Sequence, residues 1–199
     1  MRMRRTTGAI LVLLGAVLMG AALLLYMHNK QEDEEAGEAS RAIMQTMRSS
    51  VDDEIVPVRR PVPEEAEKEM KVFPIDGYDY MGWLTMPTVD LELPIMAEWD
   101  YERLKIAPCR QFGSIESNDL VIAAHHFENH FGYLGNLQID DEVFFTDVEG
   151  NEIAYVVRDT TELQETDTGA IENTPYDLIL YTCTFDLVRR TTIFLERVP

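Results

Sequence analysis

DLILYTCT at residues 177–184 and RRTTIFL at residues 189–195 are two runs of apolar and β-branched residues separated by a short loop. This pattern predicts a strand, a loop and a second strand. Alternation along the first strand places Tyr181 and Cys183 on one face and Thr182 on the other. A thiol at the open end of a strand, with a guanidinium nearby, is a place where a thiolate can form and an oxyanion can be stabilised. A half-buried structural cysteine beside solvated arginines is the plainer alternative.

Length and composition limit the classes of protein to consider. The 199 residues provide for one medium-sized domain with appendages, and an apolar content of 46% is enough for a core. The formal net charge is −19, and three arginines near the N-terminus are the only charges before His28. Because phosphate contacts need Lys and Arg, we expect no nucleic-acid partner. Cys109 and Cys183 are too few for a disulfide scaffold, although one bridge between them stays open.

The N-terminus has the pattern of a membrane anchor. An uncharged apolar run extends from Gly8 to Met27, and its length of about 20 residues lets a helix span a hydrocarbon core. Arginines before the run and acidic residues after it favour a cytoplasmic N-terminus. A cleaved signal peptide is the alternative, but the run is long for one and no clear cleavage site precedes the polar segment. In both cases we expect the bulk of the protein outside the cytoplasm.

The chain after the anchor divides by composition. Residues 1–27 form the cytoplasmic tip and anchor, and we expect residues 28–72 to form an acidic stalk that is helical in part. Prolines between residues 57 and 63 favour an extended spacer within this stalk. The low apolar content argues against a second domain there. The globular domain is expected at residues 73–199.

Short strands dominate the expected globular domain. Besides the two runs quoted first, strands are expected at residues 80–87, 91–96, 119–124, 142–147 and 153–157. A turn at residues 149–151 joins the last two into a hairpin. Closely spaced strands, turn signals between them and little helix predict a mostly β fold, a small and mainly antiparallel barrel or sandwich.

Three residues at or near the ends of predicted strands form the candidate site: His125, Cys183 and Arg190. A free thiol with a pKa of about 8.5 is only slightly ionised at neutral pH, and a nearby imidazole can take or return its proton. A cation beside the attacked carbonyl stabilises the charge that develops on its oxygen. The set suits acyl transfer and needs no carboxylate.

A metal site is the competing interpretation of this region. His126 and His130 lie close to His125 in the sequence, but the spacing fits no common zinc pattern and Cys183 would be the only sulfur ligand. We therefore expect no metal and no other cofactor. The acidic loop at residues 162–167 fits a solvated face better than a calcium site.

Several stretches resemble the sortase family. A strand ending in Thr182-Cys183, with Arg190 opening the next strand, resembles the sortase signature. The family's histidine segment, usually Gly/Ala-His-Asn with Phe-x-x-Leu after it, is similar to AAHH at residues 123–126 and HFGYL at residues 130–134. Its Leu-x-x-Gly-Asp-x-Ile/Val stretch and its opening strands are similar to residues 137–145, and to residues 83–87 with 93–95. The ordered set covers residues 80–198.

The resemblance implies a closed sortase-like β-barrel and a cysteine transpeptidase on the outer face of the cell membrane, most like the small class B-like sortases of Gram-positive bacteria. Cys183 would attack a carbonyl in a Leu-Pro-x-Thr-Gly-like signal near the C-terminus of a secreted or pilin protein. An amine of peptidoglycan precursor or a pilin lysine would then release the thioester. His125 would act as acid and then base. Arg190 would hold substrate and oxyanion, and Thr182 would help to shape the oxyanion hole.

Some positions depart from the family pattern. His126 stands where the family often has Asn, and Asp140 stands where it often has Gly. The neighbouring Arg189 leaves an ambiguity, but it would point to the face opposite Arg190. An anchored cysteine hydrolase with water as acceptor stays open. So does a non-catalytic extracellular β-module whose Cys183 is structural or bridged to Cys109.

Overall fold

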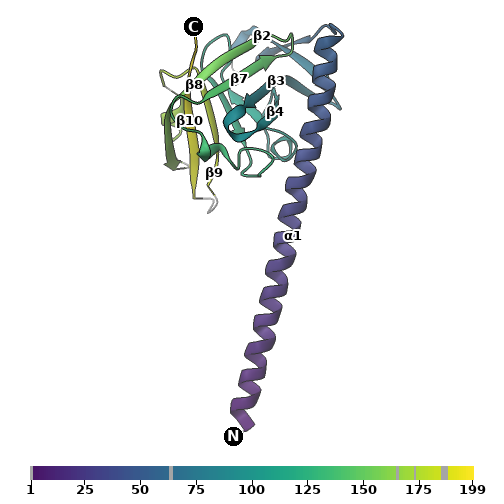
Figure 1. The fold of residues 1–199 in the computed structure, drawn as a ribbon, viewed down its shortest axis with the longest axis vertical. Coiled ribbons are helices and arrows are strands. Elements are labelled where there is room, and N and C mark those ends of the chain that lie inside the picture. The colour runs from purple at the N-terminus through teal and green to yellow at the C-terminus, as the bar shows by residue number, and fades with distance from the viewer. Residues whose placement is uncertain (1, 63–64, 165, 173, 185–187) are drawn as a thin grey trace.

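A long helix projects from a β-barrel in the computed structural model (Figure 1). The structure describes residues 2–62, 65–164, 166–172, 174–184 and 188–199. The helices are α1 (Arg2–Asp52) and α2 (Gly169–Glu172), with 3-10 turns η1 (Pro87–Val89), η2 (Arg103–Lys105) and η3 (Leu134–Asn136). The described strands are β1 (Val58–Val62), β2 (Glu65–Ile75), β3 (Tyr78–Met86), β4 (Leu91–Met96), β5 (Cys109–Phe112), β6 (Leu120–Ala124), β7 (Glu142–Asp147), β8 (Glu152–Gln164), β9 (Leu178–Cys183) and β10 (Arg189–Arg197).

Eight of the described strands close the barrel. Their order is β3-β4-β5-β6-β9-β10-β8-β7, and β7 pairs back onto β3. The strands β4 and β5 pair in parallel, as do β6 and β9. Closure depends on Gly82 of β3, because a Cβ there would lie 2.2 Å from the carbonyl oxygen of Thr146 in β7. Glycine alone avoids this clash. The predicted closed, mostly β barrel is confirmed.

Alternation along the strands produces two apolar layers. One set of side chains fills the barrel, with Leu180 of β9 and Ile122 of β6 as members. The other set covers the outer face, where Ile179 and Tyr181 of β9 belong to one apolar cluster with Ile43, Met44 and Met47 of α1. Side chains on adjacent positions of a strand point to opposite faces, so β9 serves both layers. This outer layer lies on the same face as Cys183.

The second half of α1 packs on the barrel, against β4 and β2. Its buried residues recur every three or four positions, which places them on one helical face: Ala36, Ser40, Ile43, Met44, Met47 and Ser50. Arg48 on the same half pairs with Glu92 of β4. The helix therefore continues without interruption from the apolar run into the domain.

The segment expected as a stalk differs from that expectation in two respects. Its helical part lies against the domain, and the proline-containing part forms β1, which pairs with β2 instead of serving as a spacer. The physical reason is burial, because Met70 and Val72 of β2 belong to the barrel core. Proline is tolerated in β1 since it is an edge strand. The division of the chain at residues 27 and 72 stays a prediction.

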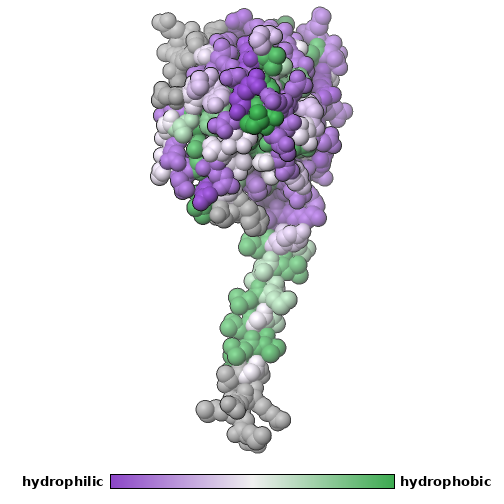
Figure 2. Space-filling model, turned by 60° about the vertical axis from the view of Figure 1, so that its left-hand side comes forward, coloured by the Kyte–Doolittle hydropathy of each residue, from purple (hydrophilic) through white to green (hydrophobic). Residues whose placement is uncertain are grey.

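The first half of α1 extends away from the barrel and exposes apolar side chains (Figure 2). Its most apolar window has a mean hydropathy of 2.6, and none of that window is buried in the protein. An exposed apolar surface of this length needs a nonpolar surrounding. The helix is thus a candidate membrane span.

Candidate functional site

Three neighbouring strands meet at one edge of the barrel. Cys183 ends β9 and is the direct cross-strand partner of Arg190, near the start of β10. On the other side of β9, Thr182 pairs in parallel with Ala124, the last residue of β6. His125 is the next residue after Ala124, so its backbone lies near the end of β9. Since adjacent strands lie about 4.8 Å apart, the backbones of the three predicted residues lie at the same end of three neighbouring strands.

The guanidinium of Arg190 lies over the aromatic ring of Tyr181. Its central carbon lies 5.3 Å from the centre of the Tyr181 ring, two residues before Cys183 on the same face. A cation over an aromatic face is held by the ring quadrupole. The Tyr181 hydroxyl donates to the Gln111 side chain, and burial raises the pKa of Tyr181 to about 12, so the ring stays neutral. Gln111, which supports this site through Tyr181, was not among the residues predicted from the sequence.

The neighbouring arginine turns away from the site. Arg189 is exposed and its guanidinium lies 2.9 Å from a carboxylate oxygen of Glu162 in β8. Its backbone N–H and carbonyl both bond with Thr184, which tightens the turn between β9 and β10. The geometry therefore favours Arg190 over Arg189 as the cation at Cys183, as alternation along the strand predicts.

The imidazole of His125 is half-buried and stacks on Phe127, with 4.9 Å between the ring centres. Burial lowers the pKa of His125 below its ordinary value, the Glu32 carboxylate opposes this shift, and the Lys105 ammonium adds to it. Burial disfavours the charged ring. At neutral pH the imidazole is therefore neutral and able to accept a proton.

The other histidines of the segment do not join the site. His130 is fully buried, and burial lowers its pKa to about 4, so it is neutral in the folded protein. Its ring packs 5.5 Å from that of Phe127, which is the environment of a core residue. His126 is half-buried, with its Nδ1 unbonded inside the protein. Among the residues that the structure describes, no group of three or more potential ligands could hold a metal ion.

The hydroxyl of Thr182 is not brought to the candidate site. Thr182 is buried on the inner face of β9, and its Oγ1 donates to the carbonyl oxygen of Ala124 at 2.9 Å. This bond joins β9 to β6 at their ends. The side chain therefore supports the position of Cys183 from behind and does not face the substrate side.

The second cysteine cannot reach Cys183. Cys109 of β5 pairs with Ala123 of β6, and Ala123 pairs with Tyr181 of β9. Cys109 is therefore two strands away from Cys183, and Cys183 lies two residues further along β9. Two spacings of about 4.8 Å already exceed the usual Cα separation of a disulfide. Both thiols are free, Cys183 is half-buried, and burial raises the pKa of Cys109 to about 12. The bridged alternative is wrong.

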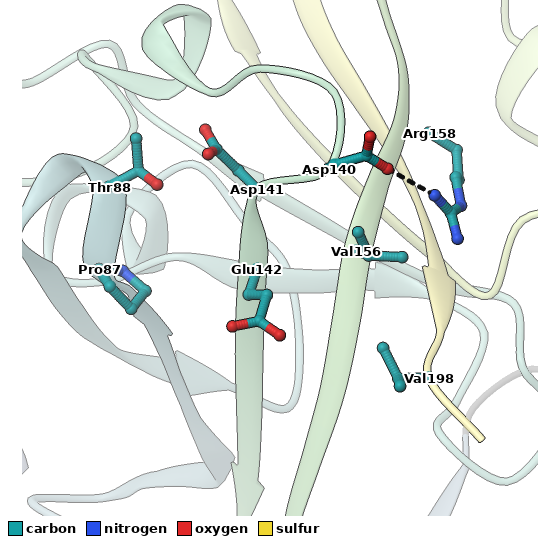
Figure 3. A pocket seen from close by; sticks show the side chains of 8 residues that line it. All are labelled: Pro87, Thr88, Asp140, Asp141, Glu142, Val156, Arg158 and Val198. Atoms are coloured by element: carbon teal, nitrogen blue, oxygen red, sulfur yellow. Dashed lines mark hydrogen bonds and ion pairs between the residues drawn. The ribbon is translucent and has the colours of Figure 1, made fainter.

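A pocket of about 510 Å³ lies elsewhere (Figure 3). Asp140 lines it and bonds to Arg158 at 2.7 Å, and Val198 places it at the opposite end of β10 from Arg190. Asp140 has a φ of 71°, a conformation in which glycine is the usual residue and Asp is tolerated. This explains the departure from the family pattern at that position without giving the pocket a part in the chemistry.

The sortase domain family model matches residues 84–198. The chain belongs to the sortase family. This range includes all three strands that carry the candidate site. No curated protein matches the chain in sequence.

Solved sortases share the fold. The chain is 20% identical to sortase C of Clostridium perfringens SM101, with a TM-score of 0.53 over 61% of this chain and 71% of that one. It is 24% identical to sortase C-1 of Actinomyces oris, with a TM-score of 0.53 over 59% of this chain and 73% of that one. It is 20% identical to sortase C1 of Streptococcus agalactiae, with a TM-score of 0.56 over 63% of this chain and 71% of that one. These are class C enzymes, but such identities show the fold and leave the subclass open. The family as a whole consists of cysteine transpeptidases.

Proposed function

We propose that this sortase is a membrane-anchored cysteine transpeptidase that attaches secreted or pilin proteins to an amine acceptor. The observation that supports this most directly is the register of β6, β9 and β10. It supports the proposal because Arg190 is the cross-strand partner of Cys183 and His125 directly follows the residue of β6 that pairs with Thr182. Nucleophile, proton carrier and oxyanion partner are what acyl transfer requires.

The proposed reaction has two halves. The thiol proton of Cys183 passes to His125, and Sγ attacks the carbonyl carbon of the sorting signal while Arg190 stabilises the oxygen. When the intermediate collapses, the C–N bond breaks and the leaving amine takes the proton from His125, which leaves a thioester on Cys183. The acceptor amine then attacks the thioester, gives a proton to His125, and releases the thiolate, which recovers that proton.

The proposed substrate is a protein with a C-terminal sorting signal of the Leu-Pro-x-Thr-Gly kind. A structure of Clostridium perfringens sortase C, 19% identical to this chain with a TM-score of 0.54, contains a C-terminal cell wall sorting motif. The likeness of fold supports the same class of substrate here. The proposed acceptor is an amine of peptidoglycan precursor or a lysine of a pilin subunit.

The proposed location is the cell membrane, with the N-terminus in the cytoplasm and the barrel outside. The apolar half of α1 supports the anchor, and the arginines at residues 2, 4 and 5 support the orientation. Anchoring suits the reaction because a membrane-borne substrate and a lipid-linked acceptor share the plane of the membrane with the enzyme.

The test is cleavage of a fluorogenic Leu-Pro-x-Thr-Gly peptide by the full chain in lipid nanodiscs, with and without an added amine. We expect Cys183→Ala to abolish cleavage and Cys109→Ala, the matched control, to retain it. Mass spectrometry should find the acyl group on Cys183 and an amine adduct as product. Cleavage by Cys183→Ala at the wild-type rate would refute the proposal. Release to water alone, even with amine present, would favour the hydrolase.

A further inference from the structure

The part of α1 that leaves the apolar run meets the loop that carries His125. Asp33 lies one helical turn before the docked face of α1 and six residues after Met27, which is roughly 9 Å along a helix. Its neighbours on that face, Ala36 and Gly37, are buried. The end of the apolar run and the helix residue that contacts the His125 loop are therefore separated by less than three helical turns.

Asp33 makes several hydrogen bonds to one residue of the loop. Its carboxylate accepts from the backbone N–H of Asn129 at 2.9 Å and from the Asn129 side-chain amide at 3.1 Å. The same amide donates to the backbone carbonyl of Asp33 at 3.4 Å. Hydrogen bonds to a charged acceptor are stronger than neutral ones. Asn129 is thereby held at both its backbone and its side chain.

The helix is shaped for this contact. A Cβ at Gly37 would lie 2.6 Å from Cγ of Asn129, closer than packed atoms approach. Glycine in the middle of a helix weakens it by roughly 0.5–1 kcal/mol relative to alanine. Gly37 thus lowers the stability of the helix, and the close approach of Asn129 explains why glycine stands at this position.

The loop transmits the position of Asn129 to the imidazole. The Phe131 N–H donates to the carbonyl of His125 at 3.2 Å, and the Gly132 N–H donates to the carbonyl of Phe127 at 2.7 Å. These bonds close residues 125–132 into a compact unit. Because the ring of Phe127 is the surface on which His125 stacks, a shift of the loop moves the imidazole.

We propose that Asp33 is a positioning residue for His125, so that the same helix that leaves the membrane sets the geometry of the active site. The inference rests on the proposed function, because it assigns His125 its role in proton transfer. Asp33 does not touch substrate and acts through Asn129 and the loop. Glu32, the residue before it, adds a negative charge near His125.

The kinetic test uses the full chain in nanodiscs and the fluorogenic Leu-Pro-x-Thr-Gly peptide. We expect Asp33→Ala to lower kcat about 10-fold and to leave KM within about two-fold, because the imidazole is displaced while the binding surface is kept. Asp33→Asn should recover most of kcat, since its Oδ1 still accepts the Asn129 N–H. Glu38→Ala, an exposed carboxylate on the same helix, is the matched control and should behave as wild type.

A second variant separates positioning from helix stability. Gly37→Ala should make α1 a better helix and yet lower kcat, because its methyl group displaces Asn129. An unchanged kcat in both Asp33→Ala and Gly37→Ala would overturn the proposal. So would a loss in Asp33→Ala that appears only in KM, or one that Glu38→Ala matches.

Amide hydrogen exchange tests the contact without any activity. In Asp33→Ala we expect faster exchange at residues 126–132, with β9 and β10 unchanged and with Glu38→Ala equal to wild type. If the wild type cleaves no peptide, the proposed function fails, and the exchange data alone decide whether α1 holds the loop. Unaltered exchange in that loop would refute the contact.

Discussion

Cys183 and Arg190 are direct cross-strand partners in the antiparallel ladder of β9 and β10, so their side chains leave the same face of the sheet. The pairing fixes a cation beside the thiol through backbone hydrogen bonds and not through a flexible loop. Tyr181 then holds the guanidinium from below, with its ring centre 5.3 Å away. Sites built on strands in this way are more precise than sites built on loops alone.

The two arginines are expected to differ sharply. Removal of one oxyanion donor typically lowers the rate by about 10² to 10³, so Arg190→Ala should lower kcat/KM of peptide cleavage by that order. Arg190→Lys should rescue little, because an ammonium lacks the planar fork. Arg189→Ala removes an exposed ion pair with Glu162 and should change the rate little. A larger loss at Arg189 than at Arg190 would contradict the assignment.

The two thiols should react at different rates. Cys183 is half-buried at the end of a strand, whereas Cys109 is fully buried and burial raises its pKa to about 12. Since the thiolate is the reactive form, iodoacetamide should alkylate Cys183 in the folded protein and leave Cys109 until the chain unfolds in urea. Peptide mapping by mass spectrometry would show the order. Equal labelling of both in the native protein would contradict the structure.

The strands of the site could be predicted from the sequence because alternation is local. The runs that became β3, β4, β6, β7, β9 and β10 carry their own pattern of apolar residues, and that pattern also places Tyr181 with Cys183 and opposite Thr182. The same alternation already separates the Thr182 side chain from the substrate side. The assignment of Thr182 to the oxyanion hole came from the family resemblance. In the structure its hydroxyl instead donates a hydrogen bond to the carbonyl oxygen of Ala124.

The docking of α1, the Asp33–Asn129 contact and the formation of β5 depend on residues that are distant in sequence. Docking of α1 needs the outer face of the barrel, and the Asp33–Asn129 contact joins residues 96 positions apart. A charged helix with a thin apolar stripe gives no sign of the surface it will meet. Strand β5 begins next to Pro108 and was not among the expected strands, because it is specified by pairing with its neighbours β4 and β6. No local pattern specifies such contacts.

His130 should make the stability of the protein depend on pH. Its pKa is about 4 in the folded state because burial disfavours the charged ring, against about 6.5 when unfolded. Because the pKa of His130 is lower in the folded state than in the unfolded state, its contribution to the free energy of unfolding is fully present above about pH 6.5. That contribution is lost as the pH falls toward 4. Between about pH 7.5 and pH 5 the wild type should lose roughly 2 kcal/mol of unfolding free energy from this residue.

The measurement is urea unfolding of wild type and His130→Gln at both pH values. Glutamine is close in size and neutral throughout, so the variant should be less stable at pH of about 7.5 and should lose less between the two values than the wild type. His28→Gln, an exposed histidine on α1, is the matched control and should follow the wild type. If His130→Gln loses as much free energy as the wild type on acidification, the buried ring is not the titrating group, and the packing of His130 against Phe127 has to be reconsidered.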